Sequence, residues 1–237
     1  MSEIGDSGIS PPPYKIVLLG ESSVGKTSLV QRFTSNTFDI HVANTIGAAF
    51  ITKLYTSRTM KDRTVKFEIW DTAGQERYRS LTPMYYRNAK LALICFDLNN
   101  FEYTFNAAKY WIQQLELNNS GEPEENAVKI QLVGTKSDLV KPDPTKSAQE
   151  REIADREMGD RLMELSRSHS NIVGFERTSS KEGSSVADLF EDIVIHIDED
   201  FFKTYYERAR TEQDAEGGGP IGSILNARHA AATSGCC

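Results

Sequence analysis

The stretch GESSVGKT, residues 20–27, decides the fold because it fits the phosphate-binding pattern G-x-x-x-x-G-K-[ST]. It follows the β-branched run Lys15–Leu19, which predicts a strand, and it leads into an amphipathic segment that predicts a helix. In this context the two glycines let successive backbone N–H groups point at one oxyanion, beside the positive end of the helix. The alternative is a chance match in a glycine-containing turn. We expect the phosphates of a nucleotide to be bound by Ser22, Ser23, Val24, Gly25, Lys26, Thr27 and Ser28.

Two residues of this loop are also expected to act in catalysis or in metal binding. The Lys26 ammonium is expected to bridge the β- and γ-phosphates and to stabilise charge during phosphoryl transfer, which makes it a candidate catalytic residue. The Thr27 hydroxyl is an oxygen ligand of the kind that Mg²⁺ prefers.

The rest of the chain to about residue 202 alternates short β-branched runs with helical patterns. The predicted strands are Lys15–Leu19, Ala48–Tyr55, Thr64–Trp70, Lys90–Phe96, Val128–Val133 and Ile172–Phe175. Only the second and third lack a helix between them, and the polar segment 57–63 joins them as a hairpin. The fold class is therefore α/β, a P-loop domain whose sheet of about six strands is mostly parallel, with one antiparallel edge strand and helices on both faces.

Composition limits the domain organisation and the partners. The chain has 237 residues with 27 Lys and Arg against 34 Asp and Glu, a net charge of −7, which argues against nucleic acid as a partner. We expect a disordered lead over residues 1–13, one globular domain over 14–202, and a flexible tail over 203–237. Of the three cysteines, Cys95 is expected to be a buried small hydrophobe, and the chain to lie in a reducing compartment.

A second motif, DTAGQE at residues 71–76, follows the predicted strand Thr64–Trp70. Asp71 would give Mg²⁺ a second contact, although a strand-terminal cap is the alternative for this residue taken alone. Gly74 lets a backbone N–H approach a γ-phosphate. Gln75 carries a donor and an acceptor, so its side chain can orient an attacking water molecule, and we expect it to be catalytic.

Two further polar stretches follow strands and suit a purine base. Asp138, in the stretch GTKSD at residues 134–138, offers two acceptor oxygens that match the N1–H and N2–H₂ donors of guanine. The stem of Lys136 can lie flat on the purine. Backbone N–H groups in the stretch Ser179-Ser180-Lys181 could bind the guanine O6. Each stretch is a weak signal by itself, and a T-K-x-D stretch alone is more often an ordinary polar loop.

Taken together with Thr45-Ile46-Gly47, these motifs resemble those of the Ras-superfamily GTPases in order and separation. The stretch WDTAGQERY, residues 70–78, resembles the Rab family, and residues 45–50 and 83–87 resemble its early-endosomal branch. The resemblance implies that Thr45 contacts Mg²⁺ and the γ-phosphate in the GTP state, and that Phe38 packs edge-on against guanine. Rab proteins usually have Asn at the position of Thr135, whereas Rho-type GTPases have Thr there, so the resemblance still implies guanine binding.

The resemblance also implies how the protein meets membranes and partners. Phe50, Trp70 and Tyr85 match the aromatic residues that Rab proteins show to effectors; the alternative is ordinary packing between the sheet and the second switch. The terminal pair Cys236-Cys237 resembles the doubly geranylgeranylated Rab terminus. The implied partners are an exchange factor, a GTPase-activating protein, a prenylation escort, a GDP-dissociation inhibitor and effectors at the cytoplasmic face of endosomal membranes. We expect the protein itself to be a monomer.

The expected activity is a GTP/GDP switch that hydrolyses GTP slowly until an activating protein completes the site. A nucleotide-dependent scaffold that does not hydrolyse GTP is the alternative, with Thr135 having weakened the base site. A P-loop ATPase or kinase is a third reading, which Asp138 after a strand disfavours.

Overall fold

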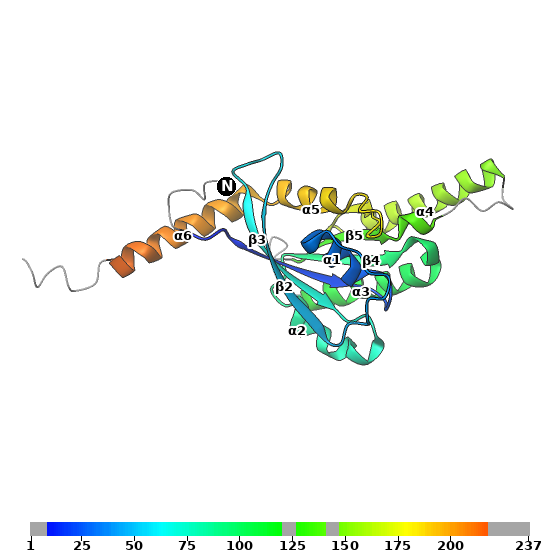
Figure 1. Ribbon diagram of the computed structural model, residues 1–237, viewed down its shortest axis with the longest axis horizontal. Coiled ribbons are helices and arrows are strands. Elements are labelled where there is room, and N and C mark those ends of the chain that lie inside the picture. Colours follow the sequence, from blue (N-terminus) through cyan, green and yellow to red (C-terminus); the bar gives the residue numbers. More distant parts are fainter. Residues whose placement is uncertain (1–8, 120–126, 141–146, 218–237) are drawn as a thin grey trace, which may run out of the picture. The chain divides into compact units, whose positions relative to one another are not determined.

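The computed structural model describes residues 9–119, 127–140 and 147–217. Its sheet has six strands in the order β2-β3-β1-β4-β5-β6, and only the pair β2–β3 is antiparallel (Figure 1). The strands are β1 (Pro13–Leu19), β2 (Ala48–Thr56), β3 (Thr64–Thr72), β4 (Leu91–Asp97), β5 (Lys129–Thr135) and β6 (Ile172–Arg177). The predicted fold class is confirmed, including the antiparallel strand at the edge.

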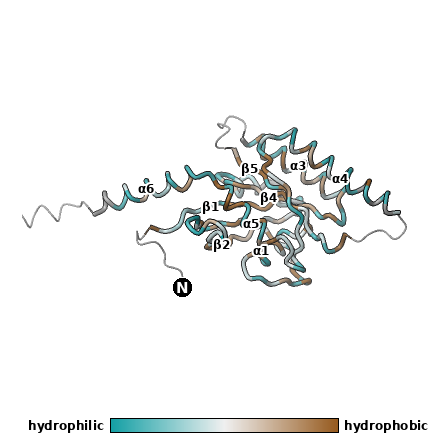
Figure 2. Tube along the Cα trace, turned by 90° about the horizontal axis from the view of Figure 1, so that it is seen from above, coloured by the Kyte–Doolittle hydropathy of each residue, from teal (hydrophilic) through white to brown (hydrophobic). Residues whose placement is uncertain are grey.

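Helices cover both faces of this sheet. They are α1 (Lys26–Ser35), α2 (Thr82–Tyr86), α3 (Phe101–Asn119), α4 (Ala148–Ser168) and α5 (Val186–Ile195), with short 3₁₀ turns at Glu76–Leu81, Leu98–Asn100 and Ser137–Leu139. Brown and teal alternate along α3 and α4, as expected of helices with one buried face (Figure 2). The stripes are Phe105, Ala108, Trp111, Ile112 and Leu115 on α3, and Leu162 and Leu165 on α4, which pack in one core with β4 and β5.

The opposite face is closed by aromatic packing between α1, α5 and the sheet. Phe33 of α1 stacks on Phe190 of α5 with ring centroids 3.5 Å apart, and both rings contact Phe67 of β3 at 5.7 Å. All three side chains are buried. This packing holds the carboxyl end of α1 against the sheet, where Phe67 lies opposite Tyr14 near the start of β1, and so fixes the direction in which α1 runs from the loop that precedes it.

The hairpin that joins β2 to β3 is anchored by one carboxylate, Glu191 on α5. Five donors converge on it: the Tyr55, Ser57 and Thr59 hydroxyls at 2.8 Å each, and the backbone N–H groups of Arg58 at 2.9 Å and Thr59 at 3.1 Å. Burial acts to raise the pKa of Glu191, but these hydrogen bonds outweigh it, so the pKa lies well below its usual range. The side chain is only 6% exposed. The polar segment 57–63 is thus a fixed part of the domain.

The end of the chain differs from the expectation. Residues 13–195 form one compact unit, and α6 (Glu199–Gly217) belongs to another. The expectation of a flexible tail from residue 203 is wrong as far as Gly217, because the composition between 199 and 216 contains no glycine or proline and suits a helix. None of the helices in the described ranges is long and apolar enough to cross a bilayer. The expected disordered lead covers residues 1–13; of these, residues 1–8 lie outside the described residues, as do the lipidation sites Cys236 and Cys237, whereas Pro13 already belongs to β1.

Candidate nucleotide-binding site

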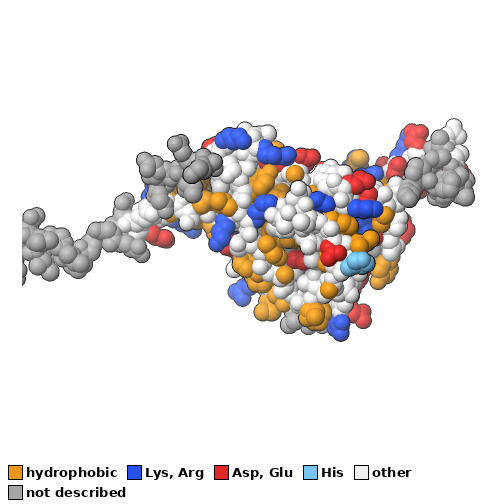
Figure 3. Space-filling model, in the orientation of Figure 1, with side chains coloured by type: hydrophobic (Ala, Val, Ile, Leu, Met, Phe, Trp, Pro, Cys, Tyr) orange, Lys and Arg blue, Asp and Glu red, His pale blue; other side chains and the backbone are white. Residues whose placement is uncertain are grey.

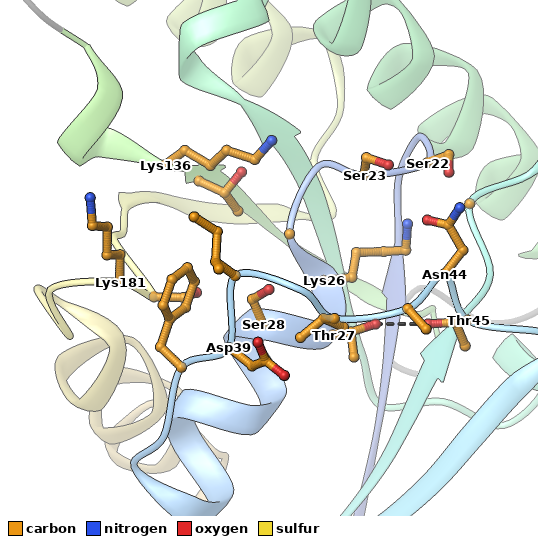
Figure 4. A pocket seen from close by; sticks show the side chains of 18 of the residues that line it. Ser22, Ser23, Lys26, Thr27, Ser28, Asp39, Asn44, Thr45, Lys136 and Lys181 are labelled. Atoms are coloured by element: carbon orange, nitrogen blue, oxygen red, sulfur yellow. Dashed lines mark hydrogen bonds between the residues drawn. The ribbon is translucent and has the colours of Figure 1, made fainter.

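A cavity of about 400 Å³ lies at the carboxyl ends of the parallel strands, between the phosphate-binding loop and the segment that links α1 to β2. Lys136 and Lys181 lie at one end of this pocket, and Lys26, Ser22 and Thr45 at the other (Figure 4). The predicted residues that line it are Ser22, Ser23, Gly25, Lys26, Thr27, Ser28, Phe38, Thr45, Gly74, Gln75, Thr135, Lys136, Asp138, Ser180 and Lys181. The sequence motifs thus meet in one cavity.

Three predicted residues support the wall from behind. Val24 is buried under the loop, Asp71 accepts a hydrogen bond from Thr27, and Ser179 donates one to Asp138. Seven lining residues were not predicted from the sequence, namely Asp39, Ile40, Val42, Ala43, Asn44, Thr72 and Leu139. Most of them come from the segment between α1 and β2. This segment has no periodic pattern of hydrophobic residues, so only Phe38 and Thr45 within it were recognised from the sequence.

The phosphate end is built by a strained loop and a buried ammonium. Gly20 and Gly25 have φ values of 148° and 103°, and a Cβ on Gly20 would lie 2.3 Å from the carbonyl oxygen of Cys95. Lys26 donates to the carbonyl oxygens of Gly20 at 2.9 Å and Glu21 at 2.8 Å. Burial lowers the pKa of Lys26, while the nearby carboxylates act in the opposite direction. The ammonium is therefore held at the loop, with its charge aimed where phosphate oxygens would bind.

Three oxygen-bearing side chains meet beside this loop. Thr27 Oγ1 donates to Asp71 Oδ2 at 2.7 Å and lies 2.8 Å from Thr45 Oγ1 (Figure 4). Asp71 is only 2% exposed, and its other oxygen, Oδ1, is buried without a hydrogen-bond partner. Burial raises the pKa of Asp71, with Thr27 and Lys26 opposing. A buried carboxylate with one orphaned oxygen, beside two hydroxyls, fits Mg²⁺.

The donor set also fits the kind of magnesium site. Within the described residues no three His, Cys, Asp or Glu side chains cluster as a metal site. Mg²⁺ keeps several waters and is usually held by one or two protein oxygens together with substrate phosphates. A set made of Thr27, Thr45 and Asp71 suits a cation bound together with a nucleotide.

The second switch motif packs directly on the loop. A Cβ on Gly74 would lie 2.4 Å from the backbone of Glu21 and Ser22, so no side chain fits there in this conformation. Gln75 lines the pocket, but its Oε1 accepts a hydrogen bond from Arg77 Nε at 2.7 Å. The Gln75 carbonyl oxygen has a second lone pair, with which it can accept from a water molecule while Arg77 donates to the first. This contact leaves no signal in the sequence pattern.

At the other end, the residues expected to bind a base are fixed by second contacts. Asp138 Oδ1 accepts from Ser179 Oγ at 2.6 Å. Lys136 has a left-handed backbone (φ 56°), and its ammonium pairs with Asp97 Oδ2 at 2.8 Å, which extends its stem along the pocket. A carboxylate held in one orientation beside an extended aliphatic stem suits a planar base with two adjacent donors.

Thr135 links the base end to the phosphate end. Its hydroxyl is 2% exposed and lies in hydrogen-bond reach of two carbonyl oxygens, those of Val24 in the phosphate-binding loop and Phe96 at 2.9 Å. A hydroxyl has a single proton, so only one of the two carbonyls can receive it at a time. Thr135 therefore ties β5 to the loop with one donor where an amide would supply two.

The three aromatic side chains form one cluster on β2, β3 and α2. Trp70 lies 5.1 Å from Phe50 and stacks on Tyr85 at 5.5 Å, measured between ring centroids. Phe50 is 51% exposed, whereas Trp70 and Tyr85 pack partly against the core. Hydrophobic side chains reach the surface over this part of the molecule (Figure 3). The cluster thus packs on the sheet and also, through Phe50, presents an apolar side chain at the surface.

Comparison with known proteins agrees with this geometry. Residues 15–199 match the Ras family. The chain is 41% identical over 191 residues to "GTP-binding protein YPT52" of Saccharomyces cerevisiae, covering 76% of this chain and 80% of the relative. It is 40% identical over 239 residues to "Ras-related protein RABF2a" of Arabidopsis thaliana, covering 100% and 99% of the two chains.

Proposed function

The chain belongs to the Ras family of small GTPases, and on this premise we propose that it is a Rab-like switch that recruits effectors to endosomal membranes in its GTP state. The observation that carries the proposal is the contact between Thr27 and Thr45 at 2.8 Å. It joins the phosphate end of the pocket to the start of the segment that leads into β2. Phe50 follows only five residues later, so a change at the γ-phosphate is passed along a short piece of chain to the aromatic surface.

Hydrolysis is the in-line attack of water on the γ-phosphate. Lys26 and the backbone N–H groups of its loop bind the phosphate oxygens and stabilise the charge that develops on them. Gln75, whose Oε1 also accepts from Arg77, accepts a hydrogen bond from the water and orients it. Thr27, Thr45 and Asp71 would hold Mg²⁺, which would supply further stabilisation of the charge on the phosphate oxygens.

Slow intrinsic hydrolysis follows from the lining of the pocket. Within the described residues no arginine lines it, so none of their guanidinium groups is placed to stabilise the transition state. An activating protein that inserts one would raise the rate by orders of magnitude. An exchange factor would then be needed to release GDP and restart the cycle.

Membrane attachment is proposed to depend on the lipidated pair Cys236 and Cys237, because two lipid chains give stable anchoring where one gives only marginal binding. A GDP-dissociation inhibitor and a prenylation escort are the partners that such an anchor requires. The resemblance of residues 45–50 and 83–87 to the early-endosomal Rab branch supports the endosomal membrane.

The switch is tested by the fluorescence of Trp70. The chain has two tryptophans, and Trp111 lies in the core, so Trp111→Phe leaves Trp70 as the reporter of the surface. We expect its emission to differ between protein loaded with GDP and protein loaded with a non-hydrolysable GTP analogue. Trp70→Phe, which leaves Trp111 as the only tryptophan, is the matched control and should show no such difference. The same emission from Trp70 in both nucleotide states would contradict the proposal.

A further inference from the structure

One arginine that does not line the pocket connects α1 to the backbone at the end of the pocket where the base is expected to bind. Arg32 of α1 donates from Nε to the Ser180 carbonyl oxygen at 2.7 Å and from Nη2 to the Lys181 carbonyl oxygen at 2.9 Å. Its Nη1 donates to the backbone oxygen of Asn36 at 3.0 Å and to the Asn36 side-chain oxygen at 3.1 Å. The planar guanidinium thus makes four hydrogen bonds at once, and the ammonium of a lysine could not reproduce this set.

These contacts fix the orientation of two successive peptide groups. In a trans peptide the C=O of one residue and the N–H of the next point in opposite directions. Because Arg32 holds the Ser180 carbonyl, the Lys181 N–H points away from Arg32, and Ser180 and Lys181 line the pocket. The next N–H, that of Glu182, donates to Ser179 Oγ at 3.1 Å, and this hydroxyl in turn donates to Asp138.

We infer that Arg32 is a positioning residue for base recognition: it holds the Ser180–Lys181 peptide so that the Lys181 N–H binds the C6 oxygen of guanine. This inference rests on the proposed GTP-binding function and names a residue outside the motifs on which that function was built. Arg32 acts through the loop, since neither its side chain nor its backbone lines the pocket. It also fixes Asn36, the left-handed residue that ends α1, so the base end is tied to the start of the segment carrying Phe38 and Thr45.

The test distinguishes the loss of the contact to the C6 oxygen from a general loss of affinity for the base. The probes are GTP and 6-thio-GTP, in which sulfur, a weaker acceptor, replaces the C6 oxygen. Each competes with fluorescent GDP on the full chain in the presence of Mg²⁺. For Arg32→Ala we expect the affinity for GTP to fall by about tenfold, the effect of one lost hydrogen bond. The affinity for 6-thio-GTP should fall much less, so the preference for oxygen at C6 shrinks.

Two further variants make the result specific. Arg32→Lys keeps the charge and the stem but loses the planar fork, so it should show most of the same loss of preference. Arg63→Ala is the matched control, because Arg63 also donates to backbone carbonyl oxygens, those of Val194 and Ile195, away from the pocket. It should leave the GTP to 6-thio-GTP ratio unchanged even if it lowers the melting temperature.

Each outcome decides the question. An equal loss for GTP and 6-thio-GTP in Arg32→Ala, no loss for either, or a wild-type ratio in Arg32→Lys would overturn the inference. If Arg32→Ala does not fold, the Arg32→Lys ratio alone decides. Failure of the proposed function looks different: the wild-type chain would then not prefer GTP to ATP, whatever residue 32 is.

Discussion

Replacing Glu191 by glutamine tests whether the hairpin between β2 and β3 is held by one carboxylate. The two Glu191 oxygens accept five hydrogen bonds, two of them from the backbone N–H groups of Arg58 and Thr59. An amide has one acceptor oxygen, and Arg58 donates to Oε2 whereas Thr59 donates to Oε1, so either orientation leaves one backbone N–H facing the NH₂ group. Hydroxyl donors can rotate to accept, but a backbone N–H cannot.

The expected loss of stability follows from the number of donors that the amide leaves without an acceptor. A backbone N–H left without a partner costs about 1–3 kcal/mol, and hydrogen bonds to a neutral acceptor are weaker by about 1 kcal/mol than those to a charged one. Some of this is recovered because the hairpin is at the surface. We expect Glu191→Gln to lower the free energy of unfolding by about 2–4 kcal/mol, a large part of the typical stability of a domain.

The assay is urea unfolding of both proteins at the same saturating GDP and Mg²⁺, because bound nucleotide adds to stability. Asp188→Asn is the matched control: Asp188 lies one turn earlier on α5 and pairs with Arg58 at 2.8 Å, but it is exposed, so its loss should cost under about 1 kcal/mol. Equal, small effects of the two substitutions would refute the anchoring role of Glu191.

The pH dependence gives a second readout of the same anchor. The pKa of Glu191 is lower in the folded chain than the ordinary value of about 4.3 that it has when unfolded. Its contribution is therefore fully present above about pH 4.3 and is lost as the pH falls through the folded pKa. The stability difference between wild type and Glu191→Gln should be constant from about pH 5 to 8 and should shrink in more acidic solution.

Four other substitutions test the site and the anchor. Gln75→Leu should leave GTP binding intact and lower phosphate release at least about tenfold, since no side chain then orients the water. Unchanged release would remove Gln75 from the mechanism. An absence of release in wild type would favour the alternative of a scaffold that does not hydrolyse GTP. Thr27→Asn should shift the nucleotide preference toward GDP, because an amide is a poor ligand for Mg²⁺. The measurement is a titration of wild type and variant with GTP and GDP, and equal GTP and GDP affinities that the substitution leaves unaltered would contradict this. Thr135→Asn should hold or tighten GTP binding, since its NH₂ can reach both the Val24 and Phe96 carbonyls, and a large loss would show that the amide does not fit. Cys236→Ser combined with Cys237→Ser should make the protein wholly cytosolic on fractionation without changing nucleotide affinity, whereas continued pelleting with membranes would place the anchor elsewhere.

The sheet and the pocket were predictable because both depend on short-range patterns. The mostly parallel sheet with one antiparallel strand follows from the alternation of β-branched runs with helical stripes and from one hairpin. The site residues lie in motifs at strand ends, which parallel strands bring to one edge. The burial of Cys95 followed from the apolar run around it.

The contacts that the sequence did not reveal join residues far apart in the chain. Arg32 and Ser180 are 148 residues apart, and Tyr55 and Glu191 are 136 apart. Such pairs leave no periodic signal, because a single polar residue on a helix is compatible with exposure as well as with a buried network. The helix α6 was missed for another reason: the glycines at 217–219 and the balanced charge suggested a linker, although the preceding residues favour a helix.

The central claim is that this pocket binds guanine nucleotide through Asp138, and the affinities of Asp138→Asn for GTP and XTP test it most directly. The carboxylate matches the two donors of guanine, whereas an Asn amide matches the C2 carbonyl and N1–H of xanthine. In competition against fluorescent GDP for wild type and fluorescent XDP for the variant, wild type should bind GTP far more tightly than XTP. Asp138→Asn should reverse that order, with the GTP affinity falling at least about tenfold for the loss of a charged hydrogen-bond acceptor. GTP binding that is unchanged in Asp138→Asn would contradict the assignment of the base site and with it the account of this protein as a guanine-nucleotide switch.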